Sequence, residues 1–165
     1  TGRQESKLII VGLAPGMHGA NRTGIPFTGD SSGDLLFKTL NKLGISNEVR
    51  ITNVVKCLPV KNAPTTTELK NCQKYIEAEL THQQTGEPRV LFALGGVAHR
   101  SVIKLRSLRQ TEFPFSHGAI HELGKGEWLV DSYHCSRYNT QTKRLTEAMF
   151  MNSMKSAARL AGLIE

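Results

Sequence analysis

The residues of this chain that are best suited to chemistry gather in three loops. The loops span residues 12–29, 56–64 and 132–142, and each directly follows a short apolar run of strand length. The first loop is rich in glycine and proline. A rigid loop of this kind, placed just after a strand, suits a pocket wall whose backbone N–H groups face a ligand. We therefore take the three loops as the candidate site.

The first loop does not carry the common phosphate-binding patterns. It lacks the Gly-Lys-Ser/Thr ending of a P-loop, and it lacks the GxGxxG of a dinucleotide-binding fold. Nucleoside-triphosphate and NAD binding therefore lose their main support.

Strands and helices are predicted to alternate along the chain, and these elements must hold the three loops. Apolar runs predict strands at residues 7–11, 49–55, 89–94, 120–123 and 128–131, the last two as a hairpin or strand pair. Caps and amphipathic spacing predict helices at residues 30–43, 65–83, 97–105 and 146–163.

This order predicts an α/β fold, a three-layer α/β/α sandwich around a mainly parallel four-stranded sheet. We expect one domain over residues 1–165. In open α/β sheets, ligands bind beyond the carboxyl ends of the strands, which is where the three loops lie.

The chain is basic, with a formal net charge of +7 and a sequence pI near 9.5. A basic chain favours nucleic acid, acidic membrane surfaces or phosphorylated metabolites, although many basic proteins bind none of these. The positive residues are spread, which suits a surface that follows a phosphate backbone. No apolar run approaches a membrane span, and three cysteines argue against a secreted disulfide scaffold. We therefore expect an intracellular, cytoplasmic protein without a membrane partner.

Four stretches resemble the motifs of the uracil-DNA glycosylase superfamily and, within it, the family 5 branch. The first motif runs from GLAPG at residues 12–16 to Asp30, and TNVVKCLP at residues 52–59 resembles the second. Residues 90–98 resemble a strand–glycine–helix unit, and HCSRYNTQT at residues 134–142 resembles the closing motif. The resemblance covers nearly the whole chain. It implies an enzyme that flips a nucleotide out of DNA and hydrolyses the bond between uracil, or also hypoxanthine or xanthine, and its sugar.

The resemblance assigns roles around the departing base. His134 donates to the uracil oxygen and stabilises the leaving anion, Asn53 pairs with the base edge, and Phe27 stacks on the base. The residues alone leave simpler interpretations open: a surface histidine, an asparagine that bonds its own backbone, and a core aromatic. Further base-binding candidates are Gly12, Leu13, Ala14, Gly16, His18 and Asn21.

Asp30 has two open interpretations. Other branches of the superfamily hold the attacking water with a polar residue in the first motif, but Leu13 and Ala14 occupy the matching positions here. Asp30 is the nearest carboxylate and is therefore a candidate to position water. It is equally a candidate helix N-cap, because Ser31 and Ser32 begin a predicted helix.

The closing motif implies contacts with DNA. Ser136 and Arg137 touch phosphates, while Tyr138, Asn139 and Gln141 reach the minor groove. No lysine stands where the motifs would place a Schiff-base nucleophile, so strand cleavage is not expected. The implied partner is DNA that contains uracil or another deaminated base, bound by a monomer.

Cys57 and Cys72 fit two small buried apolar residues, but the resemblance implies that they are thiolate ligands of a 4Fe–4S cluster. Such a cluster takes four cysteines, and the family's other pair lies upstream of the first strand. This chain has no cysteine there and does not begin with methionine. Either the upstream pair has been cut off or the cluster has been lost, and we favour truncation.

Two other functions stay open. One is a catalytically weak relative that binds uracil-containing or single-stranded DNA without releasing the base. The other is a small-molecule hydrolase or nucleotide-binding domain on the same α/β layout. The hydrolase or nucleotide-binding domain predicts no affinity for DNA. A protein that binds the phosphate backbone instead loses DNA affinity steeply as the salt concentration rises.

Overall fold

The computed structural model describes residues 1–3, 5–17, 19–60, 63–81 and 88–165. The elements in chain order are β1 (Leu8–Gly12), α1 (Ala20–Thr23), α2 (Ser31–Lys42), β2 (Val49–Asn53), α3 (Thr66–Thr81), β3 (Arg89–Leu94), α4 (Gly96–Leu105), β4 (Ile120–Gly124), β5 (Glu127–Ser132), α5 (Arg137–Gln141) and α6 (Glu147–Leu160).

The sheet has five strands in the order β2-β1-β3-β5-β4. The first four in this order run parallel, and β4 pairs antiparallel with β5 at the edge. The predicted fold class is confirmed, with β4 as a fifth strand beside the expected four. β4 alternates exposed and half-buried residues, so it carries little of the continuous apolar pattern that marks a buried strand.

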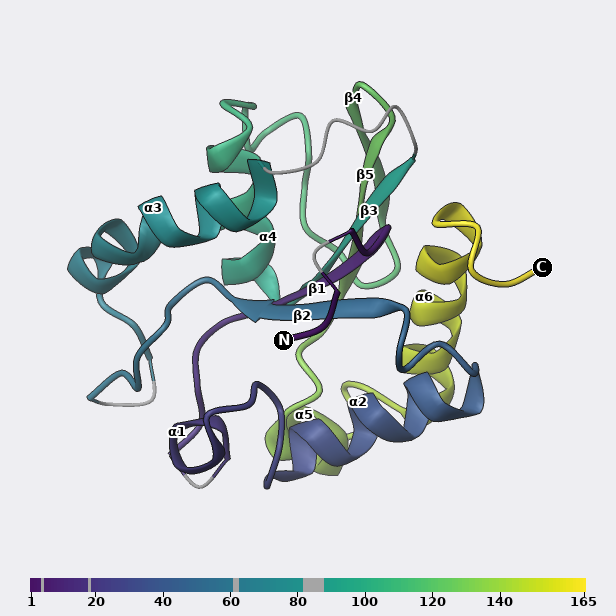
Figure 1. Ribbon diagram of the computed structural model, residues 1–165, viewed down its shortest axis with the longest axis horizontal. Coiled ribbons are helices and arrows are strands. Elements are labelled where there is room, and N and C mark those ends of the chain that lie inside the picture. Colours follow the sequence, from purple (N-terminus) through teal and green to yellow (C-terminus); the bar gives the residue numbers. More distant parts are fainter. Residues whose placement is uncertain (4, 18, 61–62, 82–87) are drawn as a thin grey trace.

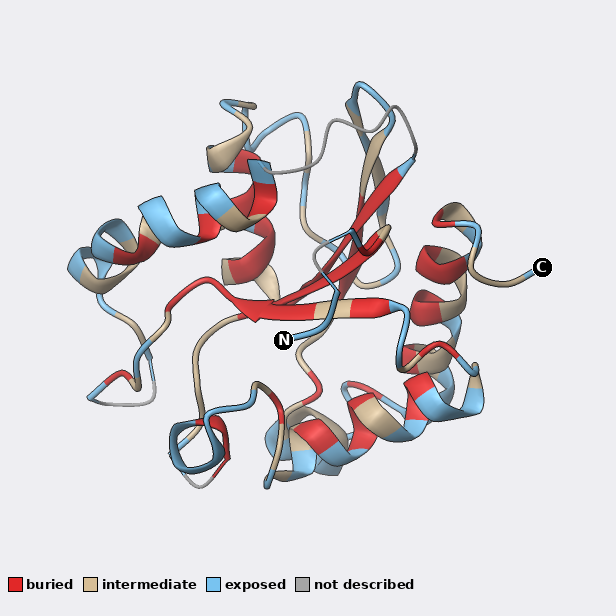
Figure 2. Cartoon of the chain, viewed as in Figure 1, coloured by how far each residue is buried: buried red, intermediate tan, exposed pale blue. Residues whose placement is uncertain are grey.

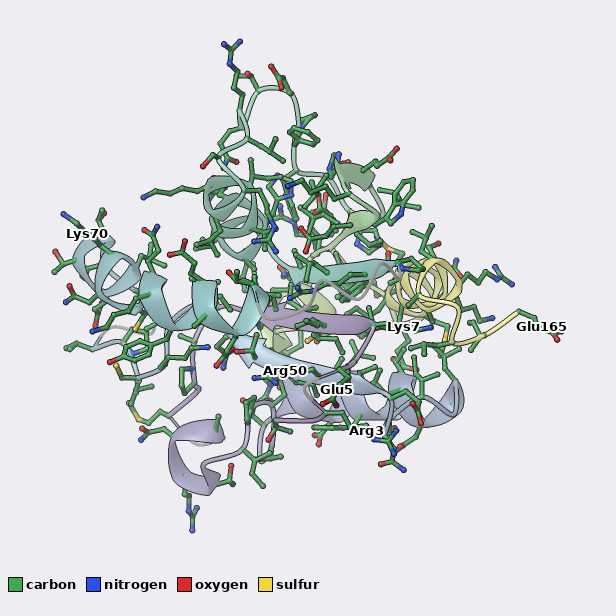
Figure 3. All side chains as sticks on the ribbon, turned by 45° about the horizontal axis from the view of Figure 1, so that its top comes forward. Arg3, Glu5, Lys7, Arg50, Lys70 and Glu165 are labelled. Atoms are coloured by element: carbon green, nitrogen blue, oxygen red, sulfur yellow. The ribbon has the colours of Figure 1, made fainter. Side chains whose placement is uncertain are left out.

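Helices cover both faces of the sheet (Figure 1). α3 and α4 lie on one face, and α2 and α6 lie on the other. Figure 3 shows the same separation, since Lys70 on α3 lies at the opposite end of the molecule from Glu165, which follows α6. The central strands are buried along their length, as Figure 2 shows in red, while the outer faces of the helices are exposed. This layering places the carboxyl ends of the parallel strands, and the loops after them, at one edge.

The predicted capping box at Thr65 is confirmed, and Thr146 caps a further helix, whereas α4 begins after Gly95 without a side-chain cap. Thr65 and Glu68 form a capping box ahead of α3: the amide of Thr65 donates to Glu68 Oε2 at 2.7 Å, and the amide of Glu68 donates to Thr65 Oγ1 at 3.2 Å. Thr146 caps α6 by accepting the amide of Met149 at 3.1 Å. The predicted end of the α3 helix at residue 83 lies outside the described residues. The short helices α1 and α5 were not predicted, because four or five residues are too few to show a helical periodicity.

One aromatic contact joins the sheet to α6. Phe92 on β3 and Phe150 on α6 are fully buried and meet edge to face, with ring centroids 5.9 Å apart. Replacing Phe150 by alanine leaves a cavity between the two layers. We expect F150A to lower the free energy of unfolding by about 3–5 kcal/mol, measured by urea denaturation. The exposed Asn152 on the same helix gives the control: N152A should change stability by no more than about 0.5 kcal/mol.

Candidate functional site

A close approach at the carboxyl ends of β1 and β2 forms the centre of the candidate site. Gly12 pairs with Asn53 in the parallel ladder, and both are buried. A Cβ on Gly12 would lie 2.3 Å from Asn53 Oδ1 and 2.6 Å from Cζ of Phe27. Only glycine leaves room for both side chains at this point.

Two buried polar atoms near Phe27 have no hydrogen-bond partner among the described residues. They are Asn53 Oδ1 and His134 Nδ1. The rings of Phe27 and His134 have centroids 6.2 Å apart. Buried polar atoms are nearly always satisfied, so an unsatisfied pair beside an aromatic ring marks hydrogen-bonding capacity for a ligand.

The imidazole of His134 is held uncharged near neutral pH. Burial lowers the pKa of His134, and the nearby carboxylate of Asp30 opposes this shift. A neutral imidazole has one N–H donor and one acceptor nitrogen. His134 can therefore donate to a developing anion without bringing a positive charge into the pocket.

The first turn of α2 packs against the backbone of Phe27. Phe27 is buried with a φ of 59°, a left-handed conformation that a bulky residue rarely adopts. Its carbonyl oxygen packs on Gly33, where a Cβ would lie only 1.7 Å away. The unusual backbone of Phe27 thus depends on a glycine in the first turn of the helix.

Asp30 is confirmed as the N-cap of α2, since its Oδ1 accepts the amide of Gly33 at 2.9 Å. Its second oxygen, Oδ2, lies against the backbone of Gly16 and Gly19. The carboxylate therefore caps the helix with one oxygen and turns the other toward the first loop. The role of Asp30 in positioning water stays a prediction.

A charged network holds the end of β2. Lys56 Nζ donates to the carbonyl of Asn53 at 2.8 Å, to Thr52 Oγ1 at 2.8 Å and to Glu79 Oε2 at 2.9 Å. Burial acts to raise the pKa of Glu79, but hydrogen bonds from Thr52 and Lys56 lower it overall. These contacts fix the backbone from which the Asn53 side chain projects.

Internal hydrogen bonds also order the loop that carries His134. Asn139 Nδ2 donates to the carbonyl of His134 at 2.8 Å, and Ser136 caps α5 by accepting the amide of Asn139. Both residues were expected to contact DNA, but here they shape the loop. Arg137, Tyr138 and Gln141 are exposed on α5, and 71% of the Tyr138 surface is accessible.

His117 steadies the residue before His134. Its Nδ1 accepts the amide of Tyr133 at 3.1 Å, and its ring stacks on the Tyr133 ring with centroids 5.1 Å apart. Burial lowers the pKa of His117, which keeps Nδ1 available as an acceptor. The Arg144 guanidinium also lies over the Tyr133 ring, 4.6 Å from its centre.

The remaining base-binding candidates lie around this centre in different ways. Leu13 lines an apolar cavity of about 390 Å³ between α3 and α4, and Ala14 packs against the core on that face. Asn21 is exposed and lines a polar hollow that Asn53 also borders. Gly16 accepts the amides of Gly19 and Asn21 and so closes the turn into α1. His18 lies outside the described residues.

The two candidate cluster ligands lie together. Cys72 is buried, and the neighbouring Cys72 raises the pKa of the exposed Cys57 thiol through charge and a hydrogen bond between the side chains. Cys135 belongs instead to the core on the α2 and α6 face. An exposed and a buried thiol in contact fit half of a four-thiolate set.

Known proteins match this chain over nearly its whole length. A profile of the uracil DNA glycosylase superfamily matches residues 1–157. The type-5 uracil-DNA glycosylase of Thermus thermophilus is 43% identical over 98% of this chain and 79% of its own length. The chain belongs to the uracil-DNA glycosylase superfamily. The type-5 uracil-DNA glycosylase of Mycobacterium leprae is 40% identical over 98% of this chain and 77% of its own length.

A type-4 uracil-DNA glycosylase from Archaeoglobus fulgidus is more distant, at 33% identity over 81% of this chain and 67% of its own length. The region that matches the superfamily contains every predicted site residue. Among the described residues, no helix is long and apolar enough to cross a membrane.

Sequence reasoning missed Gly33 and His117. A glycine inside the first turn of a helix weakens the helix, and this cost was the available signal that Gly33 has a packing role. His117 gave no such signal, because its contact with Tyr133 exists only once β5 and the preceding loop are folded together.

The exposed thiol of Cys57 and the buried thiol of Cys135 should differ in reactivity in the protein without metal. Burial raises the pKa of Cys135 to about 12, so its thiolate fraction at pH 8 is about 10⁻⁴. We expect iodoacetamide to modify the exposed Cys57 at least about 100-fold faster than Cys135, measured by peptide mass spectrometry. In urea the two rates should become similar. Equal rates in the folded protein would contradict the buried position of Cys135.

Proposed function

We propose that this protein is a monofunctional uracil-DNA glycosylase, which hydrolyses the N-glycosidic bond of uracil in DNA and so initiates base excision repair. Its relatives from Thermus and Mycobacterium are named type-5 uracil-DNA glycosylases. The observation that carries the proposal is the pair of unsatisfied buried atoms, Asn53 Oδ1 and His134 Nδ1, near the ring of Phe27.

The chemistry of these groups suits a flipped uracil. The amide of Asn53 offers one acceptor and one donor side, which match the N3–H and O4 of the base edge. Phe27 offers an aromatic face or edge to the base. Gly12 keeps this space open, because any larger residue would overlap both side chains.

Base release breaks the bond between the base nitrogen and C1′ of the sugar. The bonding electron pair stays on the base, whose negative charge spreads to its O2 oxygen, while C1′ becomes cationic and takes a water molecule. His134, as a neutral donor, stabilises the charge on O2. Asp30 orients the water through the oxygen that does not cap α2 and accepts its proton.

The closing loop supplies the contact with DNA. Arg137, Tyr138 and Gln141 are exposed on α5 just after His134, and Arg144 adds charge next to Tyr133. The exposed Arg137 faces the phosphates, and Tyr138 and Gln141 approach the minor groove, while Ser136 and Asn139 keep the loop in shape. We propose that the protein acts as a monomer on a duplex that it opens at one base.

Hypoxanthine and xanthine extend the proposed substrate range. The apolar Leu13 and Ala14 give the first motif little side-chain discrimination between bases. The same feature favours the second candidate, a weak relative that binds uracil-containing DNA without releasing the base. Neither of these two positions carries a side chain that can hold water.

Base release from an oligonucleotide with one uracil separates these functions. We expect abasic product from the parent, and a rate about 100- to 1,000-fold lower in H134A, because one donor to the leaving anion is lost. N53A should also lose activity on uracil. The exposed asparagine on α6 gives the matched control, and N152A should keep the parent rate.

The outcome for the parent decides between the candidates. Binding to uracil-containing DNA without release of uracil, hypoxanthine or xanthine would establish the weak relative. No measurable affinity for DNA, even at low salt, would favour the small-molecule hydrolase.

We further propose that Cys57 and Cys72 are two of the four thiolate ligands of a 4Fe–4S cluster. Their contact in the structure supports the pairing, and the position of Cys135 on the other face of the sheet argues against a third ligand from that loop. The cluster then needs two thiolates beyond those of these 165 residues. Its contribution when bound is to tie together the segments that carry its ligands.

Iron content tests this assignment. We expect iron in the anaerobically purified native protein, and iron at background in C57S and C72S. C135S is the matched control and should keep the iron of the parent. Iron that follows Cys135 rather than the Cys57–Cys72 pair would overturn the ligand assignment.

A further inference from the structure

A second group of metal-binding side chains lies on the α4 side of the sheet. His99 on α4, His121 on β4 and Asp131 on β5 place one ligand atom each within 4.8 Å of one another. His99 Nδ1 lies 2.9 Å from Asp131 Oδ1, and His121 Nε2 lies 3.2 Å from Asp131 Oδ2. Their three elements lie together in the upper part of Figure 1.

The group is shielded from solvent. Asp131 and His99 are almost completely buried, and 12% of the His121 side chain is accessible. The rings of Phe113 and Phe115 meet those of His121 and His99 at centroid distances of 5.8 and 5.6 Å. A buried carboxylate needs a cation or hydrogen-bond donors near it, because the charge alone is costly in such surroundings.

Counting donors shows what His99 lacks. Its Nδ1 faces the carboxylate of Asp131, and its Nε2 faces the carbonyl oxygen of Phe113 at 2.8 Å. Both partners are acceptors, but a neutral imidazole carries only one N–H. When Nε2 donates to Phe113, the lone pair of Nδ1 points at the carboxylate. A cation between these atoms removes the conflict, and that cation is either a proton or a metal ion.

The hydrogen bonding of His99 and the spacing of the three side chains are typical of a metal site. A histidine that binds a metal through one ring nitrogen usually donates its other N–H to a carbonyl or carboxylate, as His99 can donate to Phe113. Tetrahedral zinc with bonds of about 2.0–2.1 Å separates its ligand atoms by about 3.3–3.4 Å. His99 and His121 lie 2.9 and 3.2 Å from the two separate oxygens of Asp131, close to this spacing, and one ligand atom of each residue lies within 4.8 Å of the others.

We propose that His99, His121 and Asp131 bind one divalent transition-metal ion, Zn²⁺. Two imidazoles and one carboxylate favour zinc over magnesium or calcium, which prefer oxygen ligands. The ion joins α4, the β4–β5 hairpin and the segment at Phe113, and Asp131 lies just before the loop of His134. The site is separate from the Cys57–Cys72 pair and does not depend on the proposed glycosylase activity.

Metal analysis of the purified full chain tests the proposal. After growth with added zinc, we expect about one zinc per chain by mass spectrometry of the metals. H121A and D131N should each lower zinc at least about ten-fold. Because D131N alters a fully buried group, H121A is the main variant, and circular dichroism should report the parent fold for it.

Two controls separate this site from others. E122A removes the exposed carboxylate next to His121 and should keep the zinc of the parent. C57S and C72S should also keep it, since zinc bound to the cysteine pair would disappear in them. Zinc absent from the parent would overturn the proposal in favour of a proton shared by His99 and Asp131. Zinc that persists in folded H121A, or that follows the cysteines, would overturn it as well.

Discussion

The close approach of Asn53 and Phe27 to Gly12 is the contact on which the candidate site depends. The parallel ladder sets Gly12 directly beside Asn53 at the carboxyl ends of the neighbouring strands β1 and β2. Because the glycine has no side chain, an amide and an aromatic ring occupy the same small space. His134 reaches this space from the loop after β5, on the other side of β3. The sheet therefore sets the spacing between groups that lie 81 positions apart, from Asn53 to His134.

Each of these groups is held by its neighbours. Phe27 adopts its unusual backbone against Gly33 in the first turn of α2, Lys56 holds the carbonyl of Asn53, and Asn139 holds the carbonyl of His134. The backbones are thus fixed while two polar atoms stay unsatisfied. Such preorganised groups stabilise a developing charge without the reorganisation that water requires.

Much of this arrangement could be predicted from the sequence, for local reasons. Apolar runs mark the parallel strands, the Thr65–Glu68 spacing marks a helix start, and the loops at the strand ends mark the site. The direction of side chains inside the loops could not be predicted. Asn139 turns inward to His134, and Leu13 lines the cavity between α3 and α4, because tertiary packing rather than residue type sets these directions. The group of His99, His121 and Asp131 was also missed, since its members share no motif and meet only across three elements.

The strand order also determines when the proposed pocket can exist during synthesis of the protein. Phe27 and Asn53 leave the ribosome early, but the sheet order places β5 next to β3, so His134 arrives only after most of the chain has been made. Domains generally fold as units during or after translation. A nascent chain that carries Phe27 and Asn53 therefore still lacks His134, which completes the proposed pocket. The topology delays the complete pocket until β5 and the closing loop have joined the sheet.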